Sequence, residues 1–139
     1  MSVFIPCADD AAVREVVNNF QSCSCALEEF THAHHITVAV WFLSEWEFEA
    51  AMEQMRSDLL KFGAHHKKMG YNETITRFWL LLVQQFLSAS EPGLSIATLA
   101  NEAVERFADK NLIFLYYSRE RVMSEEAKRQ WLEPDLRAL

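Results

Sequence analysis

His32 and His35 are the residues of this chain best placed to do chemistry, because three of its five histidines fall between positions 32 and 35. At 100° per residue, His32 and His35 lie on one side of a helix and continue an apolar stripe through Phe42, while His34 lies on the other side. Two imidazoles that project the same way suit one metal ion or one small anionic ligand. The alternative is a pair of structural histidines that are hydrogen-bonded within the core.

A metal site here would need a third ligand. His66 is the candidate we favour, provided that the chain bends at Gly63, and Glu73 and Glu28 are the other two. The sequence leaves open whether the ligand is a divalent metal held by His32, His35 and His66 or a small molecule.

A second group of polar residues surrounds the turn at Gly70-Tyr71-Asn72. Asn72 is a good helix N-cap, and Thr76 lies one turn after it on the same, core-facing side. Glu73 points there only if the first turn is irregular. Because short links make consecutive helices antiparallel neighbours, we expect this turn to meet the histidines at one end of a bundle. The predicted ligand-binding pocket contains five residues: His32, His35, Asn72, Glu73 and Thr76.

Apolar residues at helical spacing predict the elements that position these side chains. The sequence has only three glycines and three prolines, which argues for long helices, and no stretch alternates at period two. Ser44 and Glu47 have the spacing of a capping box, which predicts a turn near 44–46. The short apolar piece 112–117 is read as helix rather than strand. The predicted helices span residues 9–20, 28–46, 46–62, 72–88, 95–107 and 124–132. We therefore predict an all-α fold, a single domain over 1–139 built as an antiparallel bundle of five to six helices.

Composition argues against several classes of partner. A formal charge of −7 disfavours nucleic acid, and the apolar run 78–83 is far shorter than the roughly 20 residues of a membrane span. The first residues lack the basic and apolar regions of a secretory leader, so we expect a cytoplasmic protein. Its three cysteines, Cys7, Cys23 and Cys25, are expected to be free thiols.

Three segments resemble a family of small bacterial proteins to which no reaction has been assigned. They are Phe30-Thr31-His32-x-x-His35, the stretch from Gly70 to Leu80 that contains Tyr-Asn-Glu-Thr-Ile-Thr, and the C-terminal Tyr117-Ser118-Arg119-Glu120-Arg121 with Glu133-Pro134-Asp135-Leu136. Members of that family usually carry histidine where this chain has Asn72. The resemblance implies a polar trio of His32, His35 and position 72, and asparagine there disfavours a transition metal.

Two classes of function remain open from the sequence. In the first, the pocket binds a small molecule or a metal; if it is an enzyme, a histidine with a pKa near neutrality would act as general base or metal ligand. In the second, the chain is a helical interaction module or a homodimer without catalytic activity. Trp41 and Phe30, which we expect to be exposed off the core stripe, motivate this second class.

Overall fold

The fold is all-helical, as the sequence predicts. The computed structural model describes residues 4–139, and Met1–Val3, part of the start that we expect to carry no leader, lie outside the described residues. Within 4–139 there is no strand. The long helices are α1 (Asp10–Gln21), α2 (His32–Glu45), α3 (Phe48–His65), α4 (Glu73–Ala89) and α5 (Ile96–Arg106). Shorter elements are the 3-10 helices η1 (Leu27–Glu29) and η2 (Lys110–Leu115) and the helices α6 (Arg119–Val122) and α7 (Glu125–Arg129).

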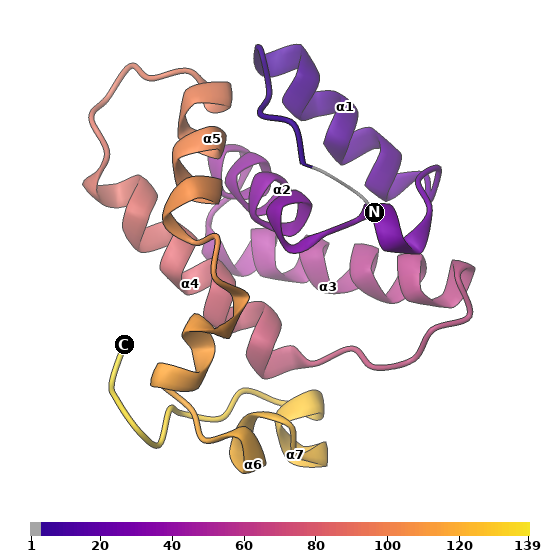
Figure 1. Cartoon of the computed structure of the whole chain (residues 1–139), viewed down its shortest axis with the longest axis vertical. Helices are drawn as coiled ribbons and strands as arrows, with labels where there is room; N and C mark the ends of the chain where they lie inside the picture. Colours follow the sequence, from indigo (N-terminus) through magenta and orange to yellow (C-terminus); the bar gives the residue numbers. More distant parts are fainter. Residues whose placement is uncertain (1–3) are drawn as a thin grey trace.

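Helix α2 is the centre of the molecule. It packs against α1, α3, α4 and α5, and Figure 1 shows these four helices around it. Consecutive residues of its middle turns are buried on all sides rather than along one stripe, Thr37 among them. Thr37, which helical spacing puts on the same side as His34, is fully buried and donates its hydroxyl to the carbonyl oxygen of Ala33. The middle of this helix, residues 36–40, has no solvent face, so helical spacing alone cannot assign one there.

Predicted caps fix the starts of four helices. The side chains of Asp9, Asn72, Ser95 and Ser124 each accept a hydrogen bond from a backbone N–H in the first turn that follows. The capping box predicted at Ser44 is wrong: its hydroxyl donates to the carbonyl oxygen of Val40, inside α2. The turn that we predict near 44–46 is confirmed, since α2 ends at Glu45 and α3 begins at Phe48.

Helix α2 begins later than the predicted residue 28. Thr31 is its N-cap, and the Nδ1 atom of His34 accepts a hydrogen bond from the Thr31 N–H at 3.2 Å and lies 2.8 Å from the Thr31 hydroxyl. These bonds hold the backbone of Thr31 outside the helix and separate α2 from η1. His34 is therefore a capping residue.

The end of α3 closes tightly on itself. We predict a kink or a stop at Gly63, but the helix continues to His65. The N–H of Lys68 then donates to the Gly63 carbonyl at 2.8 Å, and Lys67 adopts a positive φ of 56° that allows this reversal. A Cβ atom on residue 63 would lie 2.8 Å from the Lys68 carbonyl oxygen, so glycine is needed for the close approach.

The chain after α5 folds back along the start of α4, as the orange and yellow ribbon of Figure 1 shows. Tyr117 is fully buried and donates its hydroxyl to the Leu132 carbonyl at 2.6 Å. Thr74, also fully buried, donates to the Gln130 carbonyl and accepts from the Leu132 N–H. The C-terminal segment is thus fastened to the first turn of α4 by specific hydrogen bonds.

None of the helices in residues 4–139 has the length and apolar character needed to cross a membrane.

Candidate functional site

A pocket of about 540 Å³ lies between η1, the start of α2, the C-terminal half of α3 and the beginning of α4. This is the meeting place that helix order predicts, but its walls are mostly apolar. The lining residues are Leu27, Phe30, His35, Leu59, Leu60, Phe62, Gly63, Ala64, Lys68, Met69, Gly70, Tyr71, Asn72, Ile75 and Thr76. Three of the five predicted pocket residues, His35, Asn72 and Thr76, are in this wall; His32 and Glu73 are not.

His35 is a half-buried polar side chain of the pocket wall. Its ring meets the ring of Phe30 edge-on, with centroids 4.6 Å apart. Within residues 4–139 neither of its ring nitrogens makes a hydrogen bond. Burial, together with the neighbouring His32 and His34, lowers the pKa of His35 to about 4. His35 is therefore a neutral imidazole at pH 7, with one donor and one acceptor unused.

His32 has a structural role. Its Nε2 lies 2.9 Å from the carbonyl oxygen of Phe107 at the end of α5, so this nitrogen carries the proton and donates. The ring also meets that of Trp79 edge-on at 4.6 Å. Burial lowers the pKa of His32, and the bond to Phe107 opposes part of that effect. Of the two histidines, His32 is therefore hydrogen-bonded within residues 4–139 as a structural residue, and His35 is not.

Asn72 lines the pocket, but its amide is already occupied. The oxygen Oδ1 accepts from the N–H of Ile75 at 2.9 Å as the cap of α4, and Nδ2 donates to the Val122 carbonyl at 2.8 Å. Thr76 donates its hydroxyl to the Asn72 carbonyl at 2.9 Å. These side chains hold the wall together and have little left for a ligand.

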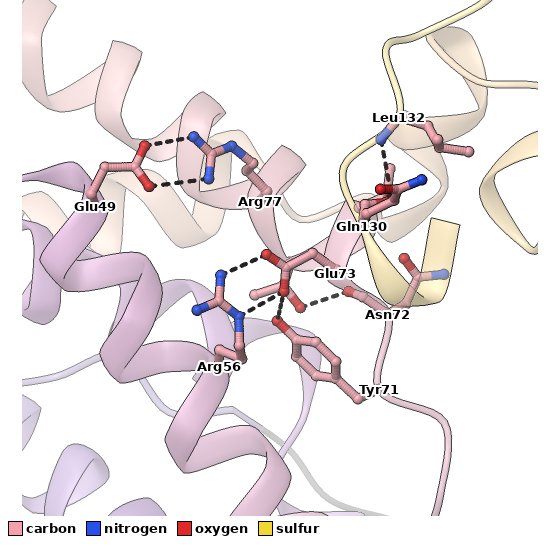
Figure 2. A network of polar contacts seen from close by, with 10 residues as sticks. Glu49, Arg56, Tyr71, Asn72, Glu73, Arg77, Gln130 and Leu132 are labelled. Atoms are coloured by element: carbon pink, nitrogen blue, oxygen red, sulfur yellow. Dashed lines mark hydrogen bonds and ion pairs between the residues drawn. The ribbon is translucent and has the colours of Figure 1, made fainter. Parts of the chain in front are cut away.

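Glu73 forms an ion pair with Arg56, which Figure 2 shows, and does not line the pocket. Arg56 donates to both carboxylate oxygens, at 2.9 Å from Nε and 2.6 Å from Nη2, and the Tyr71 hydroxyl donates at 2.7 Å. Arg56 and Tyr71 hold the pKa of Glu73 below its usual value against the effect of burial. Burial and the hydrogen bond to Glu73 raise the pKa of Tyr71. Arg56 was not among the predicted site residues; it lies on α3 and pairs with Glu73 of α4.

The predicted metal ligands do not come together. Among residues 4–139 there is no group of three or more histidine, cysteine, aspartate or glutamate side chains that could hold a metal ion. His32 is bonded to α5, His35 faces the pocket, and His66 caps the end of α3 with its ring against Phe62 at 4.5 Å. The set of His32, His35 and His66 is therefore not assembled, and Glu28, the remaining candidate, is exposed on η1.

The cysteines are free thiols, as predicted. Cys25 lines a second, smaller cavity of about 230 Å³ together with Glu29 and His34. Burial raises the pKa of Cys25, which keeps it in the unreactive thiol form, and its Sγ is directed at the Asn19 carbonyl oxygen at 3.9 Å. The imidazole of His34 is engaged by Thr31. This cavity is not arranged for nucleophilic chemistry.

The aromatic residues that suggested a protein interface are not exposed. Trp41 is half-buried against the core, with the guanidinium of Arg14 above its ring at 5.4 Å. Phe30 is stacked on Phe20 with ring centroids 4.3 Å apart and forms part of the pocket wall. Neither side chain is exposed in the way that we expect, and the interaction module or homodimer stays a prediction.

The sequence did not assign Phe30, Lys68 or Tyr71 to the pocket wall, although all three line it. Tyr71 directly precedes the predicted cap Asn72, and this position in the sequence could have indicated that Tyr71 belongs to the site.

We compared the chain with family models, with curated proteins and with solved structures. None of the three comparisons finds a match.

Proposed function

We propose that this protein binds a small, predominantly apolar molecule in the pocket and that His35 makes the polar contact with it. The observation that carries this proposal is a neutral imidazole without a hydrogen-bond partner in residues 4–139, set in an apolar pocket of about 540 Å³. Pockets of roughly 300–1,000 Å³ with apolar walls and a few polar groups are typical of small-molecule sites.

Hydrogen-bond accounting supports a ligand at His35. The His35 ring is half-buried, so a ligand that bonds to it replaces a hydrogen bond with solvent, and the net gain is about 1 kcal/mol. A ligand that offers one acceptor or one donor would satisfy the ring, while its apolar body would cover Phe30, Leu59 and Ile75. Both contributions favour the bound state.

The same geometry supports binding rather than proton transfer or metal chemistry. A general base is most effective when its pKa lies near the working pH, and an imidazole with a pKa of about 4 is a weak base at neutral pH. The nearby polar side chains that could assist it, Asn72 and Tyr71, are engaged with Val122 and Glu73. A divalent metal is not supported, since His32 is held by Phe107.

Filling the pocket tests whether it binds ligands at all. The fluorescence of the neutral probe N-phenyl-1-naphthylamine should rise and saturate at one probe per chain. Ala64→Trp places a large ring in the wall of the pocket and should weaken probe binding about tenfold or more, because the apolar contact area is lost.

Ala50→Trp is the matched control, since Ala50 is an exposed alanine of the same helix that does not line the pocket. It should bind the probe like the wild type. Absence of saturable binding, or equal weakening by both variants, would refute the proposal.

A pair of probes tests the role of His35. His35→Leu should weaken the binding of 1-naphthol about fivefold, the value of one net hydrogen bond near 1 kcal/mol, and should leave naphthalene unaffected. In the wild type, the ¹⁵N resonances of the His35 ring should shift when 1-naphthol is added, whereas those of exposed His65 should not. Equal losses for both probes would show that His35 contributes shape only.

A further inference from the structure

We infer that the ligand of the pocket is an anion: a carboxylate with an apolar body, whose charged end lies at Lys68 and whose body extends toward Phe30 and His35. This inference rests on the proposed function and specifies the chemical class of the molecule bound. The juxtaposition that carries it is one cation in the wall of an otherwise uncharged, apolar pocket.

The charge of the wall is opposite to that of the chain. Twenty aspartates and glutamates against thirteen lysines and arginines give the protein a formal charge of −7, yet within residues 4–139 no acidic side chain lines the pocket. His35 is neutral at pH 7, so Lys68 is the lining residue that carries a full charge. Glu73, the nearest carboxylate in the sequence, is neutralised by Arg56 and lies outside the wall.

Lys68 has no competing partner. Within residues 4–139 its ammonium group takes part in no ion pair and no side-chain hydrogen bond. By contrast, Lys61 of the preceding helix donates to the Gln21 carbonyl, and Lys128 pairs with Glu125. A carboxylate bound at the pocket mouth would therefore gain the lysine without breaking an existing contact.

The backbone holds Lys68 at this position. Its N–H is bonded to the Gly63 carbonyl at 2.8 Å, and the N–H groups of His66 and Lys67 donate to the carbonyls of Phe62 and Ala64. Three carbonyl oxygens at the end of α3, which would repel an anion if they were free, are thus paired. Lys68 is exposed and Met69 beyond it is almost fully so, which puts the cation at the solvent end of the pocket.

An amphipathic carboxylate fits both ends of this site. The charged group would remain at the hydrated mouth beside the ammonium, where little desolvation is required. The apolar body would enter between Leu59, Phe62 and Ile75. Binding should then strengthen with the length of the body, by about tenfold for two added methylene groups that become buried.

The test compares decanoate with decan-1-ol at pH 7.5, each measured by displacement of N-phenyl-1-naphthylamine. The variant is Lys68→Gln, and the matched control is Lys67→Gln, because Lys67 is an exposed neighbour that does not line the pocket. Lys68→Gln should lower the affinity for decanoate about fivefold and change the affinity for decan-1-ol by less than twofold. Lys67→Gln should leave both affinities unchanged, and 1 M salt should reduce the affinity of the wild type for decanoate toward that of Lys68→Gln.

Each failure has its own signature. If Lys68→Gln weakens both compounds equally, or leaves decanoate unchanged while both still displace the probe, the anion assignment is overturned and the apolar pocket stands. If the neutral probe does not bind to the wild type, the proposed function fails, and this inference fails with it.

Discussion

The two polar regions that border the pocket are built in opposite ways. At the start of α4, the side chains of Asn72, Glu73 and Thr76 are all bonded within the protein. At the start of α2, the ring of His35 has no hydrogen bond within residues 4–139. The first region determines the shape of the wall, and the second supplies the group that meets a ligand. A polar residue at a site is therefore informative only once its partners are known.

The largest effect that tests this comparison is expected at Asn72. Asn72→Ala removes the cap of α4 and leaves the buried Val122 carbonyl without its donor, which together should lower the free energy of unfolding by about 3 kcal/mol. Urea denaturation at pH 7 measures it. Asn72→Ser, which retains a cap acceptor, should recover about 1 kcal/mol of that loss.

Asn18→Ala is the control, because Asn18 is exposed in α1 and its side chain makes no hydrogen bond within residues 4–139. It should change stability by less than about 0.5 kcal/mol. If Asn72→Ala were as stable as the wild type and bound the neutral probe poorly, Asn72 would belong to the ligand-binding group and the comparison would be broken.

The next effect concerns His35 and acid. Its pKa falls from an ordinary 6.5 to about 4 on folding, so the unfolded chain binds more protons than the folded one between these values. The contribution of neutral His35 to the free energy of unfolding is therefore fully present above pH 6.5 and decreases as the pH falls. Between pH 7 and pH 5, this residue alone should lower the free energy of unfolding by about 2 kcal/mol. His35→Leu should abolish this part of the pH dependence, as measured by urea denaturation at the two pH values. An unchanged acid sensitivity in the variant would mean that His35 is well hydrated in the folded protein.

The smallest effect is expected at the paired carboxylate. Arg56→Met should destabilise the protein by about 1 kcal/mol at pH 7, a modest value because the Arg56 side chain is 37% exposed. The Glu73 pKa is depressed in the folded state, so the stabilisation is present above its ordinary 4.5 and is lost as the pH falls through the lower, folded-state pKa. Glu73→Gln should make the free energy of unfolding less dependent on pH in that acidic range.

The pair of Glu49 and Arg77 offers a matched control, since Glu49 is 70% exposed against 12% for Glu73. Glu49→Gln should have a smaller effect than Glu73→Gln. Equal effects would show that burial does not distinguish the two pairs, both visible in Figure 2.

Local rules predicted much of this fold and only part of its site. The helices and their caps at Asp9, Asn72 and Ser95 depend on residues within a few positions of each other, and these were predictable. The role of His32 depends on Phe107, which is 75 residues away, and the role of Asn72 depends on Val122, 50 residues away. Spacing along one helix carries no information about such partners. The bond between Thr31 and His34 is local, however, and three-residue spacing at a helix start could have indicated it.

The bonds between α4 and the C-terminal segment impose an order on assembly. A nascent chain that has been synthesised only as far as Lys110 already contains the residues of all five long helices, but it lacks the backbone groups of Val122, Gln130 and Leu132 that pair with Asn72 and Thr74. Until residues 122–132 leave the ribosome, the donors of two buried side chains at the start of α4, Asn72 and Thr74, lack these partners. The wall of the pocket can therefore reach its final form only after the segment 122–132 has been synthesised.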